Sequence, residues 1–390
     1  MIMNMHRKRF RSLIAVLLGL FIEPGIAGVL SEDRADTMYH YYDGGGVQIT
    51  GPSVLVRKKF KESLSLYGNY YVDSISSASI DVITSGASAY TEERTEMTLG
   101  ADYLHDDTTM SMSFTNSSEN DYEADSLNLG ISQEVFGGMT TLGMGYGRGS
   151  DVVGMRGDST FAEDVDRRNY RLSVSQVITR NMLLGVFYEA ITDEGHLNNP
   201  YRSYRYVDPD NPTNYLWRTE VYPNTRSSNA VSMKSRYYLS PGAAAYGGFR
   251  FYTDTWGIDA YNFDVGYSQP LRQAWILDLN YRFYSQEHAN FYADLFPYED
   301  AQNFLGRDKE LSTFISHTIR FGVTYNFLQD GWQFLDKGTV NFFYDRVMYE
   351  YKDFRDLTQL DENGVALPAG QEPFYEFSAD IIQVLFSFWF

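Results

Sequence analysis

The chain has 390 residues with 32 Lys and Arg, 51 Asp and Glu, and no Cys, which gives a formal net charge of −19. The absence of Cys excludes a thiolate nucleophile, a disulfide framework, a Cys zinc site and an iron–sulfur cluster from this chain. The negative charge argues against a nucleic-acid partner, because binding to phosphates needs a basic face. Aromatic residues make up 16% of the chain, far more than disordered chains carry.

The first 27 residues have the organisation of a secretory signal peptide. Four basic residues between positions 7 and 11 precede an apolar run over residues 13–22, and residues 25–27 are small enough for a signal peptidase. Ten apolar residues are too few to cross a bilayer as a helix, which takes about 20. We expect cleavage after Ala27, or after Ser31 as a second choice, so that residues 28–390 form a single mature domain with a formal charge of −22.

The mature chain alternates between apolar and polar side chains in steps of two. In one example, Trp275, Leu277, Leu279, Tyr281 and Phe283 alternate with polar residues, which places them on one face of a strand. A helix would scatter these apolar side chains around its axis. Sixteen segments of this kind predict strands at 35–43, 47–59, 62–74, 94–104, 108–118, 122–135, 139–150, 166–179, 182–193, 227–239, 243–254, 257–269, 274–286, 312–327, 338–352 and 374–390.

The lengths of the strands and of their connections predict a membrane barrel. Most of the segments have about ten to thirteen residues, close to the 9–11 of a tilted membrane-spanning strand and longer than the usual 5–6. Short turns alternate with mostly longer connections, which we expect at 75–93, 151–165, 194–226, 287–311 and 353–373. We therefore predict an all-β fold: a transmembrane antiparallel barrel of about 16 strands in the bacterial outer membrane, with the lipid bilayer around it and closure removing its edges. A soluble propeller or β-helix would show internal repeats, and none is evident.

The C-terminal strand carries two further signals. Phe386, Phe388 and the terminal Phe390 alternate on one face, which resembles the signal read by the barrel-assembly machinery, so we expect that machinery as a partner. The alternation slips at Asp380, where we expect a bulge or a change of environment.

Several short stretches resemble an uncharacterised family of bacterial outer-membrane proteins, domain of unknown function 3570 (DUF3570). The stretches are residues 32–36 with Tyr41-Tyr42, residues 51–53, residues 72–79, residues 195–202 and Phe343-Tyr344-Asp345, together with Phe390. The resemblance implies no activity. It does imply, through the genes that accompany such proteins, a lipoprotein or a periplasmic redox partner.

Charged residues at inward positions of the C-terminal half are the first candidate site. They are Lys234, Arg236, Arg250, Asp264, Asp278, Arg282 and Arg320, with Asp345 beside them. One hypothesis is an electropositive constriction that selects anions. The alternative is a ladder of cross-strand ion pairs that stabilises the wall.

The longest predicted loop, 194–226, is the second candidate site. Its aromatic and basic side chains, which include Tyr201, Arg202, Tyr204, Tyr215 and Trp217, could stack on a ligand or a partner protein. The alternative is a loop that folds inward or packs on itself.

The sequence predicts no enzyme. It contains no G-x-S-x-G, H-E-x-x-H or P-loop motif, and its few His residues are scattered, so we assign no catalytic, cofactor or metal residue and expect no cofactor. A barrel of this size leaves an aqueous lumen unless loops fill it. The leading hypothesis is a porin-like channel for small polar solutes. The alternative is a non-conducting scaffold that anchors lipoprotein or periplasmic partners of a redox-linked envelope complex.

Overall fold

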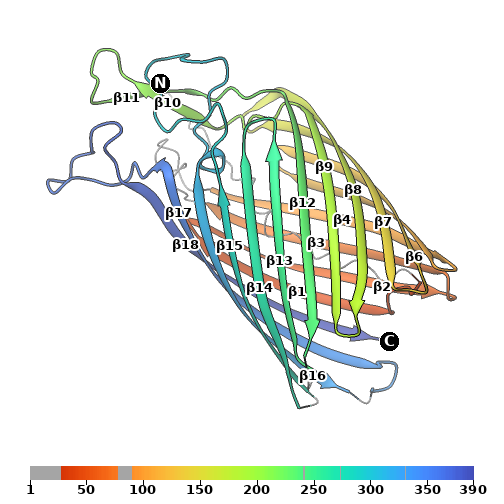
Figure 1. The fold of residues 1–390 in the computed structure, drawn as a ribbon. Coiled ribbons are helices and arrows are strands. Elements are labelled where there is room, and N and C mark those ends of the chain that lie inside the picture. Colours follow the sequence, from red (N-terminus) through yellow and green to blue (C-terminus); the bar gives the residue numbers. More distant parts are fainter. Residues whose placement is uncertain (1–27, 78–89, 240–241, 273, 330) are drawn as a thin grey trace.

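Sixteen antiparallel strands close into one barrel in a computed structural model of the chain (Figure 1). The structure describes residues 28–77, 90–239, 242–272, 274–329 and 331–390. The elements are β1 (Arg34–Gly44), β2 (Val47–Phe60), β3 (Leu64–Ser77), β4 (Tyr90–His105), β5 (Thr108–Glu119), β6 (Tyr122–Val135), β7 (Thr140–Met155), β8 (Asp158–Thr179), β9 (Met182–Gly195), β10 (Ser203–Val207), β11 (Tyr215–Thr219), β12 (Thr225–Tyr238), β13 (Ala244–Asp254), β14 (Asp259–Leu271), β15 (Trp275–Gln286), the 3-10 turn η1 (Lys309–Leu311), β16 (Phe314–Leu328), β17 (Lys337–Arg355) and β18 (Phe374–Trp389).

The predicted fold class is confirmed, and each of the sixteen predicted segments corresponds to one barrel strand. Every barrel strand pairs with its neighbour in sequence, except that β9 pairs with β12 across the β10–β11 hairpin. Pairing of β1 with β18, from Arg34 opposite Trp389 to Gly44 opposite Ala379, closes the barrel. The predicted signal peptide, residues 1–27, lies outside the described residues. The signal peptide and both predicted cleavage sites, after Ala27 and after Ser31, remain predictions. No helix among the described residues is long and apolar enough to cross a membrane.

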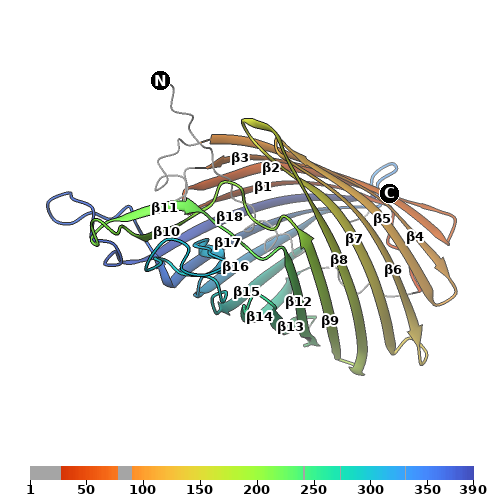
Figure 2. The same ribbon diagram turned by 90° about the horizontal axis from the view of Figure 1, so that it is seen from above.

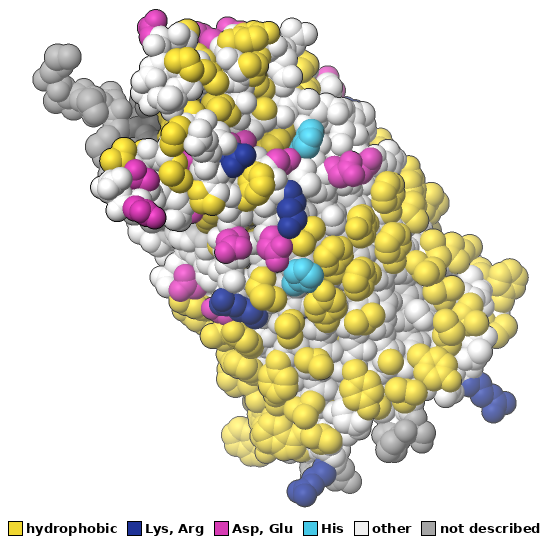
Figure 3. Space-filling view, turned by 60° about the vertical axis from the view of Figure 1, so that its left-hand side comes forward, with side chains coloured by type: hydrophobic (Ala, Val, Ile, Leu, Met, Phe, Trp, Pro, Cys, Tyr) yellow, Lys and Arg dark blue, Asp and Glu magenta, His cyan; other side chains and the backbone are white. Residues whose placement is uncertain are grey.

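The outer surface of the barrel is apolar over much of its height. Alternate side chains such as Leu127, Leu129 and Ile131 on β6, or Leu172 and Val174 on β8, are exposed on the outside. Figure 3 shows hydrophobic side chains covering the lower wall, with charged side chains more frequent towards the loop end. An apolar surface of this extent is stable only against lipid, so the protein is an outer-membrane barrel, as predicted.

The two ends of the barrel differ in their connections. Short turns join the strands at the end that holds the start of β1 and the end of β18, whereas β10, β11 and the connections 287–313 and 356–373 lie at the other end (Figure 2). The predicted long loop at 151–165 is wrong, because β7 and β8 continue to a tight turn at residues 156–157. Apolar side chains such as Val152 and Val153 fall on both faces of these strand ends, which hides the alternation. The backbone pairing continues there with one register shift after Gly154.

The C-terminal strand is regular where its sequence pattern slips. The ladder between β17 and β18 runs without a shift from Lys337 opposite Trp389 to Glu350 opposite Glu376, so the bulge considered at Asp380 is absent. Asp380 stays on the outer face and accepts hydrogen bonds from the hydroxyl of Tyr344 and from Nη1 of Arg346, both at 2.7 Å. The two partners on β17 explain how a carboxylate is tolerated there.

The β2–β3 ladder is interrupted at Gly51-Pro52. Pairing runs from Val47 to Thr50 and resumes at Ser53. Proline has no backbone N–H to donate to the ladder. A Cβ atom on Gly51 would lie 1.7 Å from the carbonyl oxygen of Val72, so only glycine fits beside β3.

Replacing Gly51 by alanine is expected to destabilise the barrel by on the order of 1–3 kcal/mol, because β2 and β3 must move apart. The control is Gly68→Ala on β3, where the added Cβ would meet no atom closer than 3.4 Å. Urea unfolding in lipid vesicles, followed by tryptophan fluorescence, measures both variants. Equal unfolding midpoints for the two variants would contradict the expectation.

Candidate functional site

The seven predicted lumen residues all point to the inside of the barrel. Arg250 illustrates the assignment, because its neighbours Phe249 and Phe251 are exposed on the outer face. Arg282 on β15 lies opposite Asp264 on β14, and Asp264 lies opposite Gly248 on β13. The others, Lys234, Arg236, Asp278 and Arg320, occupy inward positions of β12, β15 and β16.

Several of these charges are paired with one of opposite sign. Nε and Nη2 of Arg320 lie 2.6 and 2.7 Å from the two carboxylate oxygens of Asp345. Nη2 of Arg250 lies 3.1 Å from Oε2 of Glu189 on β9. The basic groups of Lys234 and Arg236 lie 5.7 and 6.0 Å from the ring centres of Phe187 and Tyr246. This part of the wall therefore carries a ladder of mixed sign, with Arg282 and Asp264 at its centre.

The N-terminal half of the wall carries inward charges that the sequence analysis did not single out. Arg57 on β2 is bonded to Asp102 on β4. Nε of Arg167 on β8 lies 2.8 Å from Oδ2 of Asp151 on β7. The residues on either side of each of these side chains face outward. The alternation in steps of two that identifies the inward residues of the C-terminal half therefore identifies these residues as well.

Glycines on β7 make room for part of this network. Residues 143, 145, 147 and 149 are all glycine and all face inward. A Cβ on Gly145 would lie 3.5 Å from the side chain of Arg171, and one on Gly149 would lie 3.4 Å from that of Arg167. The strand thus gives the arginines of β8 space to lie along the inner wall.

A second inward cluster joins β1, β3 and β4. Nε2 of His40 lies 2.7 Å from Oδ1 of Asp73, and the ring of Tyr71 stacks on that of His40 at 5.1 Å. Nη2 of Arg94 lies 3.2 Å from the other oxygen of Asp73. Two of the stretches that resemble DUF3570 meet here in their described parts, because residues 51–53 of β2 lie between His40 on β1 and residues 72–77 of β3. The interruption at Gly51-Pro52 therefore lies directly beside this cluster.

Three connections at the loop end are held together by four charged side chains, which we call the loop lock: Arg205, Asp294, Arg307 and Glu372. Arg205 on β10 is bonded to Asp294 of connection 287–313 and, at 2.5 Å, to Glu372 of connection 356–373. Arg307 lies 3.0 Å from Asp294. The side chain of Arg205 is fully buried, so its charge depends on these carboxylates.

Glu220 lies buried beside the loop lock. Its carboxylate accepts hydrogen bonds from the backbone N–H of Arg307 and from the hydroxyl of Tyr222, both at 2.6 Å. Burial raises the pKa of Glu220 to about 7, and the nearby carboxylate of Asp308 adds to the increase. A carboxyl group that gains its charge near neutral pH thus lies where two connections meet.

The predicted loop residues belong to the same cluster. Tyr201, Arg202 and Tyr204 are 5%, 4% and 1% exposed, and Arg202 lies 3.0 Å from Asp308. Tyr215 and Trp217 are partly exposed on β11 and contact each other edge to face. A ligand from outside could reach the first three only if the connections separate. Their role in recognition remains a prediction, and their contacts are those of a loop that packs on its neighbours.

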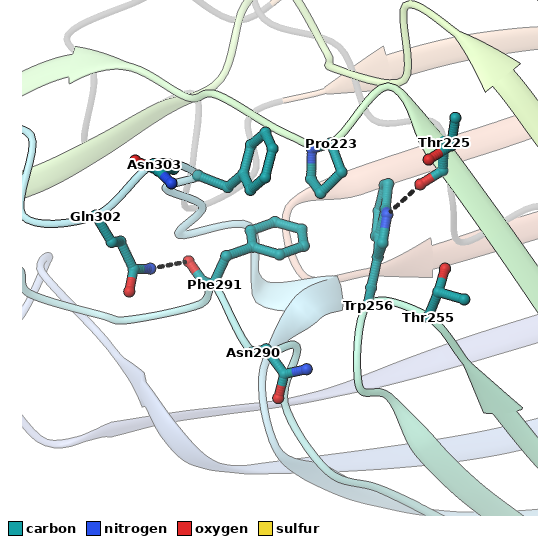
Figure 4. A pocket seen from close by; sticks show the side chains of 9 residues that line it. Pro223, Thr225, Thr255, Trp256, Asn290, Phe291, Gln302 and Asn303 are labelled. Atoms are coloured by element: carbon teal, nitrogen blue, oxygen red, sulfur yellow. Dashed lines mark hydrogen bonds between the residues drawn. The ribbon is translucent and has the colours of Figure 1, made fainter.

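A pocket of about 440 Å³ lies beside these connections (Figure 4). Trp256 and Phe291 line it together with uncharged polar side chains, among them Asn290, Gln302 and Asn303. Nε1 of Trp256 donates a hydrogen bond to the carbonyl of Thr225, and Nε2 of Gln302 to that of Phe291. No local sequence pattern indicates this pocket, because its lining comes from three separate connections.

None of the candidate clusters has the composition of a metal centre. Among the described residues, no three His, Asp or Glu side chains are grouped as metal ligands would be. The five inward arginine and lysine side chains of β12, β13, β15 and β16 face aromatic rings and carboxylates along the inner wall.

Comparison with known proteins identifies one family. The model of a family described as "Protein of unknown function (DUF3570)" matches residues 82–334. Of the stretches quoted above for the resemblance, only residues 195–202 fall inside this match. No curated protein sequence matches the chain.

Several solved structures resemble the chain at low sequence identity. A bacterial polysaccharide outer-membrane secretin shares 9% identity over 93% of this chain and 100% of its own, with a TM-score of 0.49. A FadL homologue from Pseudomonas aeruginosa shares 8% over 92% and 90%, with a TM-score of 0.46. CymD, a monoaromatic hydrocarbon channel, shares 8% over 93% and 89%, with a TM-score of 0.44. Likeness at this level carries no information on function.

Replacing Arg205 by methionine is expected to open the loop cluster. It removes the cation bonded to the buried carboxylate of Glu372 and leaves Asp294 with Arg307 as its nearest cation, which costs on the order of 3–5 kcal/mol. Proteinase K should then cut the connections of the folded protein at least tenfold faster while the barrel stays intact. Arg218→Met is the control, because Arg218 pairs with Glu299 at the surface, where such pairs contribute about 0–1 kcal/mol. Equal cleavage rates in both variants would refute the loop lock.

The loop cluster is expected to be more stable in mild acid than in mild base. The pKa of Glu220 is raised in the folded state. Below the pKa of the unfolded state the carboxyl is neutral in both states, so burying it carries no charge penalty. As the pH rises through about 7, the buried group becomes charged and the stability of the loop cluster falls. Proteinase K cleavage of the wild type, divided by that of Glu220→Gln, should rise on the order of tenfold between about pH 5.5 and pH 8.5. Glu299→Gln, in the exposed pair with Arg218, should leave the ratio flat. A flat ratio for Glu220→Gln as well would disprove the assignment.

Proposed function

The chain belongs to the DUF3570 family of proteins of unknown function. For this member we propose the function of an outer-membrane channel for small polar solutes. The observation that carries the proposal is the inner wall. Charged side chains of both signs line it on strands from β2 to β17, while the outer face is apolar. A wall of this kind suits hydrated solutes, which exchange water for side-chain hydrogen bonds along the lumen.

Mixed charges along the wall favour modest ion selectivity. Arg320 and Arg250 already have carboxylate partners, so the field at any one height is a small difference between opposite charges. Arg282 faces Asp264 across one ladder and Thr318 across the next. We therefore infer that the basic residues of β12–β16 tune the passage of anions rather than forming a strict anion filter.

A non-conducting scaffold is the second candidate, and the loop lock favours it. Three connections tied by buried ion pairs at the loop end would give a lipoprotein partner at that end a fixed structure to hold. A periplasmic partner would instead contact the short turns at the opposite end. This scaffold would bring no cofactor of its own. The barrel-assembly machinery and its signal at Phe386, Phe388 and Phe390 also belong to this set of proposals. The ring of Phe388 packs on Phe327, and Phe390 lies beside Lys58.

Planar-bilayer recording separates the two candidates. The channel proposal expects stepwise conductance from purified protein and, in a salt gradient, a reversal potential that moves towards cation preference in Arg250→Ala and Arg282→Ala. Lys352→Ala is the control, because Lys352 pairs with Glu350 on the exposed outer side of β17 and should leave the potential unchanged. Protein that shows no conductance and co-purifies with a lipoprotein would contradict the channel proposal and support the scaffold.

A further inference from the structure

Two neighbouring strands show the same order of side chains on their outer faces. Going towards the loop end, β7 presents Leu142 and Met144, then Tyr146, then Arg148. On β8 the equivalent positions are Val174 and Leu172, then Tyr170, then Arg168. The rings of Tyr146 and Tyr170 lie 5.3 Å apart, so apolar, aromatic and basic layers follow one another on this face.

The height of the basic layer corresponds to the outer boundary of the membrane. Arg148 is eight residues from the lower end of β7, and Arg168 is eleven residues from that of β8. At about 3.3 Å per residue and a tilt of about 40°, these lengths are roughly 20 and 28 Å of height. The apolar band of such barrels is about 25 Å tall, with aromatic residues at its edges. The arginines therefore lie at the level of the outer lipid headgroups.

The two arginines are placed against each other. Arg148 lies directly opposite Arg168 in the β7–β8 ladder. Like charges at such a pair of positions destabilise a sheet, and long side chains at this spacing can share one ligand. Arg148 is 61% exposed, and its Nη2 lies 3.6 Å from a carboxylate oxygen of Asp166. Arg168 forms no hydrogen bond or ion pair with any of the described residues.

The acidic residues nearby lie on the far side of this layer. Asp166, Asp125 and Glu194 follow the arginines towards the loop end, and Asp125 is engaged by Asn116 at 2.9 Å. On β17 the same order of tyrosine and arginine occurs at Tyr344 and Arg346, where Asp380 supplies the anion from within the wall. At Arg148 and Arg168 the wall supplies only one carboxylate for two guanidinium groups.

We propose that Arg148 and Arg168 bind a phosphate group of an outer-leaflet lipid. Two guanidinium groups on one face offer paired N–H donors that match the oxygens of a phosphate, and the tyrosines below them suit the boundary between acyl chains and headgroups. The phosphate removes the repulsion between the arginines. The site anchors the barrel to the leaflet and does not depend on whether the lumen conducts.

Thermal unfolding in defined lipid tests the site. The protein is placed in phosphatidylethanolamine vesicles that contain either diphosphorylated lipid A or the same lipid without its phosphates, and Tm is read from heat-modifiable gel mobility. The wild type should gain several degrees from the phosphorylated lipid, and the double variant Arg148→Gln with Arg168→Gln should lose that gain. Arg180→Gln, an exposed arginine at the turn of the opposite end, should keep it in full.

Three results would overturn the proposal. They are an equal gain in the double variant, an equal gain from the dephosphorylated lipid, or the same gain from inorganic phosphate added to protein in detergent, which would indicate a free anion. Should the double variant not assemble, Arg168→Gln alone is measured, and it should lose at least half of the gain. A second measurement needs no unfolding. The wild type and Arg168→Gln are extracted with detergent, and the lipid phosphate that each protein retains is assayed. The wild type should retain more phosphate than the variant.

Discussion

Inside a bilayer, every backbone N–H and C=O group must find its partner within the protein, and this requirement determines the structure of the chain. The pairing of β1 with β18 meets it, because it leaves no strand edge open to lipid. Closure also fixes which side of each strand faces outward. Once Phe386 faces lipid, its neighbours on adjacent strands face lipid as well, and every second residue faces the lumen.

The charged interior follows from that division. An inward arginine such as Arg320 meets Asp345 on the next strand because the ladder register brings the two side chains together. Cross-strand pairs of this kind stabilise the wall and also make it polar. The same side chains therefore serve stability and, if the lumen conducts, the passage of hydrated solutes. The cluster of His40, Asp73 and Arg94 shows the same principle beside the interrupted ladder at Gly51.

The loop end depends on a different interaction. Arg205 contacts Asp294 and Glu372, which lie 89 and 167 residues away in the sequence, and its buried charge ties three connections into one unit. On the outside, the tyrosines and arginines of β7 and β8 match the layers of the membrane. The barrel thus presents three surfaces to three environments: an apolar band to lipid, a mixed-charge wall to the lumen, and an interlocked loop cluster to the exterior.

The sequence by itself determined the strands, their number, and the inward position of residues such as Arg250, Arg282 and Arg320, because alternation in steps of two is a local property that a short window displays. It also pointed to the family through short stretches of residues. It did not determine where β7 and β8 end, since apolar and polar side chains are mixed on both faces of these strand ends. Only the tertiary structure decided that Tyr201, Arg202 and Tyr204 are buried and that Arg148 lies opposite Arg168. Those contacts depend on the register between strands and on the meeting of distant connections, which closure of the barrel brings about and no local pattern encodes.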